Sequence, residues 1–398
     1  MNKRTIKELD VKGKKVLVRV DFNVPLSKED RSKIADDSRI KAALPTIDYL
    51  LDNEAKVILI SHLGRPGGEA NAELSLKPVA NWLADHYGDK FQFLPSDEVV
   101  NDEVTEKVNN LKDGQLALLE NTRYVAGETK NDETFAQKLA SLADLYVNDA
   151  FGTSHRAHAS NVGVASILPS AVGFLIEKEI DVMGKALENP EHPFISILGG
   201  AKVSDKIGVI ENLITKVDII LIGGGMAYTF LKAQGKEIGK SLLEEDKMDL
   251  SLELLDRAKE NGVEILLPED VVIADDIAPG VETEIVDIDS IPVDKEALDI
   301  GPKTAEKYAE KIKAAKTVVW NGPMGVFEIK EFSNGTNKVA NALAEADATT
   351  IVGGGDSALA IEMADLKDKI THVSTGGGAS LEFLEGKDLP GISAIEDK

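Results

Sequence analysis

Short runs of apolar residues recur along the chain, and each ends near a glycine, asparagine or aspartate before a stretch with helical periodicity begins. Unbroken apolar runs of a few residues are typical of strands that are buried on both faces of a parallel sheet. The pattern predicts strands at 15–20, 56–60, 115–119 and 144–147 in the first half of the chain, and at 194–198, 218–222, 263–267, 317–320, 350–352 and 372–374 in the second.

Amphipathic segments separate these runs. The clearest span residues 77–87, 132–143 and 303–315, with apolar positions at helical spacing. Because strands and helices alternate throughout, we predict an α/β fold with two doubly wound parallel sheets and helices on both faces of each.

The length of the chain predicts two domains, because 398 residues exceed what one ordinary core holds. The last strand predicted in the first half ends near Val147, and an amphipathic segment at 173–188 stops before Asn189-Pro190. Proline cannot continue a helix. We therefore predict a connector helix at 173–188, between a first domain at 1–172 and a second at 189–388.

Composition excludes several classes of protein. The sequence has no cysteine, so it has no disulfides or thiolate metal sites, and its formal net charge of −24 argues against a nucleic-acid or anionic-membrane partner. No apolar run approaches the ~18 residues that span a membrane, and the polar N-terminus lacks a signal-peptide core. We expect a cytoplasmic protein with small-molecule substrates.

The arginines are unevenly distributed, and this favours an anion site in the first half. Seven of the eight precede residue 157. Three of them follow predicted strands, in loops that also carry Asn23 and His62: residues 21–23, 61–66, 120–123 and 152–158. Ligands bind beyond the carboxyl ends of parallel strands, and arginine binds anions bidentately. One such arginine could be a structural salt bridge, but three at equivalent strand ends favour a ligand.

The strand ends of the second half carry glycine instead, at 199–200, 223–225, 322–325, 353–355 and 376–378. Glycine lets the backbone approach a phosphate, and the N–H groups that open a helix favour its charge. One such turn is weak evidence because tight turns need glycine, but five favour a nucleotide site. Asp356 could bind Mg²⁺ there or only cap its helix.

Familiar nucleotide motifs are missing from the sequence. Residues 235–241 resemble a P-loop but are one residue short and follow a predicted helix, and no turn fits G-x-G-x-x-G. This disfavours a nicotinamide-dependent dehydrogenase. A two-domain solute-binding protein has no use for five phosphate-type turns. His155 and His158 have no thiolate or H-E-x-x-H partner, which disfavours zinc.

Nine segments, in order along the chain, carry a resemblance to a known family. They are RVDFNVP (19–25), SHLGRP (61–66), LENTRYVAGE (119–128), AFGTSHRAHAS (150–160), LGGAKVSDK (198–206), GGGMAYTF (223–230), VWNGPMGVFE (319–328), GGGDSA (353–358) and STGGGASLE (374–382). Through them the chain closely resembles the phosphoglycerate kinases over essentially its full length. Gly67-Gly68 and Ser154 depart from the family pattern, but neither departure touches a residue expected to bind ligand.

The resemblance implies reversible, Mg²⁺-dependent phosphoryl transfer between ATP and 3-phosphoglycerate, giving ADP and 1,3-bisphosphoglycerate in glycolysis and gluconeogenesis. It implies a monomer whose C-terminal segment, here 389–398, returns to the first domain. The implied substrate residues are Asp21, Phe22, Asn23, Arg39, His62, Leu63, Gly64, Arg65, Arg123 and Arg156. The implied nucleotide residues are Lys202, Lys206, Gly301, Asn321, Pro323, Glu328, Gly353, Gly354, Gly355, Asp356 and Ser357, with Asp356 as the metal ligand. The implied catalytic residues are Arg39, Lys202, Gly376 and Gly377.

Two sites on separate domains imply closure about the connector helix, because the ligands must meet and water must be excluded. We expect small-angle scattering to show compaction mainly when 3-phosphoglycerate and nucleotide are both bound. Each ligand alone serves as the control, and an unchanged radius of gyration with both would contradict closure.

Overall fold

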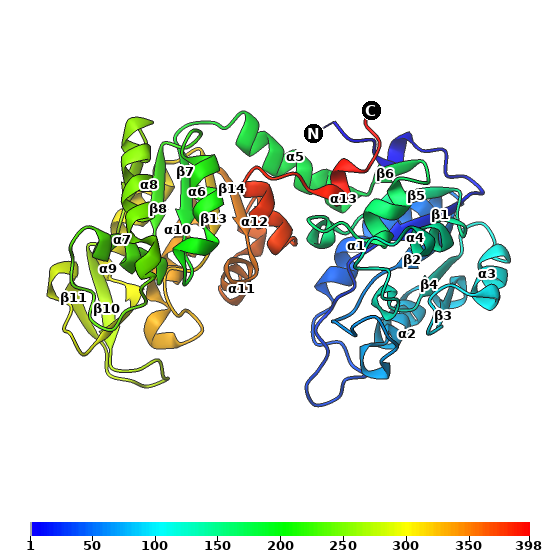
Figure 1. Cartoon of the computed structure of the whole chain (residues 1–398), viewed down its shortest axis with the longest axis horizontal. Coiled ribbons are helices and arrows are strands. Elements are labelled where there is room, and N and C mark those ends of the chain that lie inside the picture. The colour runs from blue at the N-terminus through cyan, green and yellow to red at the C-terminus, as the bar shows by residue number, and fades with distance from the viewer. Residues whose placement is uncertain (1) are drawn as a thin grey trace. The chain divides into compact units, whose positions relative to one another are not determined.

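The chain forms two compact units in the computed structural model, which describes residues 2–398 (Figure 1). The N-terminal unit contains the residues up to Asp181 together with the tail Asp388–Lys398, and the C-terminal unit is Val182–Lys387. Within the described residues, no helix is long and apolar enough to cross a membrane.

A six-stranded parallel sheet organises the N-terminal unit, in the order β3-β4-β2-β1-β5-β6. In its centre Val18 lies opposite Leu59 on one side and Val147 on the other. All three are fully buried, as expected where both faces of a sheet are covered. The strands are β1 (Lys15–Arg19), β2 (Lys56–Ile60), β3 (Phe91–Leu94), β4 (Leu116–Leu119), β5 (Leu145–Asn148) and β6 (Ser170–Val172).

The sequence pattern predicted the four inner strands of this sheet and missed the two at its edges. Three of the four residues in β3 are only half-buried, and β6 has three residues. An edge strand has one neighbour, so it need not carry the continuous apolar run by which we recognised the inner strands.

Four helices of the N-terminal unit connect these strands. Ile40, Ile47 and Leu50 of the first helix are fully buried in the same hydrophobic core as the sheet. Side-chain caps start two of the others, with Asn101 accepting from Val104 N and Asp132 from Phe135 N. The helices are α1 (Ser38–Asp52), α2 (Lys77–Tyr87), α3 (Asp102–Asn109) and α4 (Glu133–Ala140).

The C-terminal tail packs within the N-terminal unit, where Figure 1 shows both chain ends close together. Gly391, in α13 (Pro390–Ser393), donates to Ser154 O (2.8 Å), and its carbonyl accepts from Asn148 Nδ2 (2.8 Å). Arg4 N donates to Glu396 O (2.9 Å). Backbone and side-chain hydrogen bonds therefore fix the tail against the loop that follows β5.

A second six-stranded parallel sheet organises the C-terminal unit, in the order β15-β14-β13-β7-β8-β9. Its central Trp320 is fully buried, with Ile197 and Val352 opposite it. The strands are β7 (Phe194–Leu198), β8 (Ile219–Ile222), β9 (Glu264–Leu266), β13 (Thr317–Asn321), β14 (Thr349–Gly353) and β15 (His372–Val373). The helices are α6 (Ile207–Leu213), α7 (Met226–Ala233), α8 (Met248–Glu260), α9 (Pro302–Ala314), α10 (Asn334–Glu345), α11 (Gly355–Met363) and α12 (Gly378–Leu384).

A three-stranded antiparallel sheet also belongs to the C-terminal unit, and the sequence analysis did not predict it. Its order is β11-β10-β12, from β10 (Asp270–Ala274), β11 (Glu284–Asp287) and β12 (Glu296–Ile300). Each of its strands contains acidic residues, and β11 is largely exposed. Exposure explains why β11 was missed, and Asp299 interrupts the apolar run of β12, but β10 is fully buried and its apolar run at 271–274 was overlooked.

Helix α5 (Phe174–Glu188) occupies the segment predicted as a connector, and the division between the two units falls within it. Buried Asp149 caps its first turn, because Asp149 Oδ1 accepts from Leu175 N (2.9 Å) and Ile176 N (3.4 Å). Burial raises the pKa of the Asp149 carboxyl to about 7. The start of α5 is thus anchored to the N-terminal unit by a buried acid.

We expect Asp149→Asn to remove a pH-dependent part of the stability of the N-terminal unit. Folding raises the pKa of Asp149 from 3.8 to about 7, so the folded unit binds more protons than the unfolded chain between these values. Its free energy of unfolding should therefore fall as the pH rises through that window. Asparagine does not ionise, so the variant should gain stability relative to the parent chain over the same pH range.

Urea denaturation in a Trp320→Phe background measures this effect, because Trp82 is then the remaining tryptophan and reports on the N-terminal unit. The parent with Trp320→Phe alone is the control. A stability difference that stays constant from pH 4 to pH 8 would contradict the assignment of this titration to Asp149.

Candidate active site

Hydrogen bonds join three strand-end loops of the N-terminal unit. Gly64, after β2, donates its N–H to Asn23 Oδ1 (2.9 Å) in the loop after β1. The Gly64 carbonyl accepts from Arg123 Nη1 (2.8 Å) in the loop after β4. The structure therefore brings together three predicted substrate residues that lie far apart in the sequence.

Asp21 and Arg39 form an ion pair that joins the end of β1 to the start of α1. Arg39 Nη1 lies 3.0 Å from Asp21 Oδ2, and the Asp21 side chain is 14% exposed while that of Arg39 is 39% exposed. The remaining N–H groups of Arg39 make no hydrogen bond to the described residues. Asp21 thus orients a guanidinium that keeps donors for a ligand.

A pocket of about 340 Å³ shares Arg123 with this cluster, and all the charged residues that line it are cations. Arg65, Arg123 and Arg156 line it together with Lys130 and His158, and its lining contains no carboxylate. Arg123 Nε is buried without a hydrogen-bond partner. The positive charge of the lining side chains would stabilise an anion in this pocket.

Burial and mutual repulsion set the charges of the cationic groups. The pKa of His62 lies well below 6.5, first through burial and then through Arg19 and Arg123. Burial, followed by Arg123 and Arg19, lowers the pKa of His158 to about 4. Burial also lowers the pKa of Arg123 to about 10, with Arg19 and Arg156 contributing. At neutral pH the site therefore combines charged guanidiniums with neutral imidazoles.

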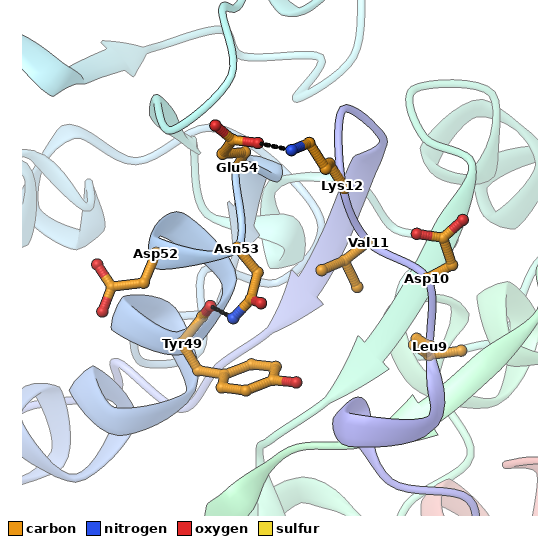
Figure 2. A pocket seen from close by; sticks show the side chains of 8 residues that line it. All are labelled: Leu9, Asp10, Val11, Lys12, Tyr49, Asp52, Asn53 and Glu54. Atoms are coloured by element: carbon orange, nitrogen blue, oxygen red, sulfur yellow. Dashed lines mark hydrogen bonds and ion pairs between the residues drawn. The ribbon is translucent and has the colours of Figure 1, made fainter.

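A second pocket of the N-terminal unit, of about 260 Å³, has the opposite electrostatic character (Figure 2). Asp10, Asp52 and Glu54 line it beside Tyr49. Its one cation, Lys12, lies 2.5 Å from a carboxylate oxygen of Glu54, as Figure 2 shows. Excess negative charge makes this pocket unsuitable for phosphates.

The other predicted substrate residues differ in exposure. Phe22 and Leu63 are buried in the hydrophobic core, so only their backbone could meet a ligand. Arg65 and Arg156 are exposed, and Arg156 Nε lies 3.2 Å from His155 Nε2. The two arginines can therefore adjust to a ligand, whereas buried Arg123 is held in place.

Several glycine turns of the C-terminal unit pack directly on one another. A Cβ on Gly199 would overlap the carbonyl oxygen of Pro323, and one on Gly224 would lie 2.7 Å from Gly200 N. Backbone hydrogen bonds join the same turns, from Gly200 N to Pro323 O (3.0 Å) and from Gly224 N to Met324 O (2.9 Å). Close backbone packing therefore explains part of the glycine content that suggested phosphate binding.

Two of the predicted glycines have no such packing role. Around Gly355 and Gly377, no heavy atom outside the adjoining chain lies within 4 Å of the position of a Cβ. Gly355 begins α11 beside the exposed Asp356, and Gly377 precedes α12. Gly376 N already donates to Ser374 Oγ (3.2 Å). The backbone at Gly355 and Gly377 is thus open to the approach of a phosphate.

Lys206 is a buried cation held between the glycine turns. Its Nζ donates to Asn321 Oδ1, and Asn321 Nδ2 donates to Gly353 O (3.0 Å). Burial lowers the pKa of Lys206, while Asp205 and Asp356 act in the opposite direction. The turns after β13 and β14 therefore share one positioned cation.

The remaining predicted nucleotide residues fall into two groups. Lys202 and Glu328 are exposed, which leaves both side chains accessible. The buried Ser357 hydroxyl accepts from Gly322 N (2.6 Å), and Gly354 has a φ of +92°, where glycine is favoured. Both residues thus also shape the turn after β14.

Gly301 has a structural explanation. A Cβ at this position would overlap the carboxylate of Asp270. That carboxylate accepts from Lys303 N (3.0 Å) and Thr304 N (2.8 Å), so it already satisfies the first turn of α9. The start of α9 is therefore occupied by a protein carboxylate, and close packing accounts for the glycine.

Comparison with known proteins identifies the family. A sequence model of the phosphoglycerate kinase family matches residues 6–387. The chain belongs to the phosphoglycerate kinase family. The phosphoglycerate kinase of Finegoldia magna is 60% identical over 398 residues, covering all of both chains. That of Thermosipho africanus is 59% identical over 402 residues, covering 100% of this chain and 99% of the relative.

Solved structures of phosphoglycerate kinases show the same fold. The enzyme from Coxiella burnetii matches with a TM-score of 0.90 and 41% identity, and that from Pyrococcus horikoshii OT3 with 0.83 and 35%; each match covers 98% of both chains. The two six-stranded parallel sheets are therefore the phosphoglycerate kinase fold. The chain has phosphoglycerate kinase activity, a phosphoryl transfer to a carboxyl acceptor in glycolysis.

The structure adds residues to the site that the sequence analysis did not include. Arg19 and Lys130 were not among the predicted site residues, and His158 was considered mainly for zinc. The sequence did contain a sign of the role of Arg19, since this arginine lies in an otherwise apolar strand. Arginines are seldom fully buried, so one in such a strand suggests a specific task.

Proposed function

We propose that the N-terminal unit binds 3-phosphoglycerate at the loop cluster and its cationic pocket. The observation that carries this proposal is a pocket lined by three arginines without a carboxylate, in a chain of net charge −24. Guanidinium groups bind phosphate and carboxylate bidentately. The proposed residues are Asp21, Phe22, Asn23, Arg39, His62, Leu63, Gly64, Arg65, Arg123 and Arg156, with Phe22 and Leu63 acting through their backbone.

The nucleotide would bind at the strand-end turns of the C-terminal unit. Lys206 supplies a positioned charge, and Gly355 supplies an open backbone at the first turn of α11. Exposed Lys202 and Glu328 would add side-chain contacts. The proposed residues are Lys202, Lys206, Asn321, Pro323, Glu328, Gly353, Gly354, Gly355, Asp356 and Ser357, with Gly301 supporting the start of α9.

Mg²⁺ would be held through Asp356, an exposed carboxylate at the start of α11 that lies close enough to affect the pKa of Lys206. Among residues 2–398, no group of three or more His, Cys, Asp or Glu could form a protein cage for a metal. A single carboxylate nevertheless fits Mg²⁺, which takes many of its ligands from water and phosphate oxygens. When bound, the ion would neutralise phosphate charge.

Phosphoryl transfer would then depend on positioning and charge. The acceptor is a carboxylate, ionised at neutral pH, so it needs no general base. Arg39, Lys202 and backbone N–H groups at Gly376 and Gly377 would stabilise the transferring group. Because Gly376 N already bonds Ser374, Gly377 is the more available donor. One chain supplies all these groups, so the mechanism requires no second copy.

Arg39→Ala should lower kcat for ADP formation from ATP and 3-phosphoglycerate by about 10²- to 10³-fold, because a donor to the transferring group is lost. A coupled assay of ADP formation measures this, and thermal unfolding checks that the variant remains folded. The control is Arg31→Ala, since Arg31 is exposed and, among the described residues, donates a hydrogen bond only to the Glu73 carbonyl. Retained turnover would exclude Arg39 from catalysis.

Asp356→Asn should weaken binding of Mg-ADP by about tenfold, because one charged ligand of the metal is lost. Calorimetry should show unchanged affinity for 3-phosphoglycerate and for ADP in the presence of a chelator. Asp365→Asn, an exposed change just beyond the other end of α11, is the control. Equal weakening of metal-free ADP would assign Asp356 to the fold of the turn and not to the metal.

A further inference from the structure

Arg19 is a fully buried arginine that the proposed mechanism leaves without a task. It ends β1 and is 1% exposed. Its Nε donates to Ser160 Oγ (2.8 Å), its Nη1 donates to the Val20 carbonyl, and its Nη2 lies 3.0 Å from His62 Nδ1. All three nitrogens of the guanidinium are therefore engaged, one of them by a proposed substrate residue.

The contact with His62 determines which ring nitrogen carries the proton. Arginine has only donors and remains protonated in proteins. His62 Nδ1 must therefore accept from Arg19, which places the ring proton on Nε2. No described residue forms a hydrogen bond with Nε2, so this N–H remains for a ligand.

The surroundings of His62 keep the ring neutral. It is 4% exposed, and the charged or titratable groups that act on it are Arg19, Arg123, His158 and Arg39. Burial and these cations together lower the pKa of His62 well below 6.5. The ring is thus prevented from gaining a second proton at physiological pH.

The buried charge of Arg19 is itself compensated. Ser160 Oγ accepts from Arg19 and donates to Glu128 Oε1, and Ser160 N donates to Glu128 Oε2 (3.0 Å). Glu128 is fully buried and also accepts from Thr122 Oγ1 (3.3 Å). Such hydrogen bonds offset the free-energy cost of burying a charged guanidinium. The Glu128–Ser160–Arg19 chain is therefore a rigid support behind His62.

We propose that Arg19 is a positioning residue that holds His62 as a neutral donor, with Nε2–H directed to the anionic substrate. This inference rests on the proposed role of His62 in binding 3-phosphoglycerate. The proposal implies that His62 takes up no proton when the substrate binds. His62 should therefore add no pH dependence to substrate binding between pH 5 and pH 8, where an ordinary histidine changes its charge.

The first test uses the unaltered protein with ¹⁵N-labelled histidine. NMR correlations within the imidazole ring should show the His62 proton on Nε2 and an unprotonated Nδ1, both unchanged from pH 5 to pH 8. The His62 signals are assigned by their loss in His62→Gln, and the exposed His86 is an internal reference. A proton on Nδ1, or titration of His62 in this range, would overturn the proposal.

The second test removes the guanidinium. In Arg19→Met, the pKa of His62 should rise, because a cation and the donor to Nδ1 are both lost. The KM for 3-phosphoglycerate should increase about tenfold at pH 8 and recover in part at pH 5, where His62 becomes a cation. Dividing the KM of the variant by that of the parent at each pH cancels the titration of the substrate phosphate.

Arg19→Lys and Arg31→Met complete this experiment. Lysine keeps a positive charge but lacks the planar guanidinium that reaches all three acceptors. Compared with Arg19→Met, the Arg19→Lys variant should therefore recover most of the stability of the parent but little of its KM for 3-phosphoglycerate. Arg31→Met should match the parent. A folded Arg19→Met whose KM ratio is constant with pH would overturn the proposal, and if that variant does not fold, the NMR measurement decides.

A failure of the proposed substrate role of His62 can be distinguished from a failure of the positioning role of Arg19. Calorimetry of His62→Gln with 3-phosphoglycerate tests whether His62 binds substrate at all. Unchanged affinity there would refute the substrate role of His62 even if NMR shows the expected tautomer. Weakened affinity combined with the wrong tautomer would refute the role of Arg19 alone.

Discussion

Parallel pairing places the carboxyl ends of neighbouring strands at one edge of a sheet, and both units form their candidate sites at that edge. In the N-terminal unit this constraint brings Asn23, Gly64 and Arg123 into hydrogen-bonding distance from three different strands. In the C-terminal unit it does the same for Asn321 and Gly353. The interiors of the strands can therefore be mainly apolar, because the polar side chains gather at and beyond the carboxyl ends, as Arg19 and Asn321 do.

Binding anions in a strongly acidic chain requires cations that are fixed locally. The N-terminal unit contains such cations, because Arg19 and Arg123 are buried while Arg65 and Arg156 are exposed. Burial, and then the positive charge of these arginines, lowers the pKa of His62 and His158. The same arrangement therefore concentrates positive charge and keeps His62 and His158 neutral.

The sequence predicted the inner strands and most strand-end residues because both leave local signals, a continuous apolar run and a following glycine or arginine. It did not predict β3, β6, β11 or β12, which are short, partly exposed or interrupted by charged residues, and it overlooked β10, which does carry an apolar run. It also could not separate Gly199 from Gly355. One is required by a carbonyl in a distant turn and the other has open space beside it, and such pairings exist only in three dimensions.

The mutual packing of the glycine turns limits how this enzyme can evolve. A side chain at Gly199 would displace the Pro323 carbonyl, which also holds Gly200, so a change in one turn disturbs its neighbours. A substitution in one turn would therefore require compensating changes in the turns packed against it, whereas an exposed side chain such as Glu328 can be replaced without disturbing that packing.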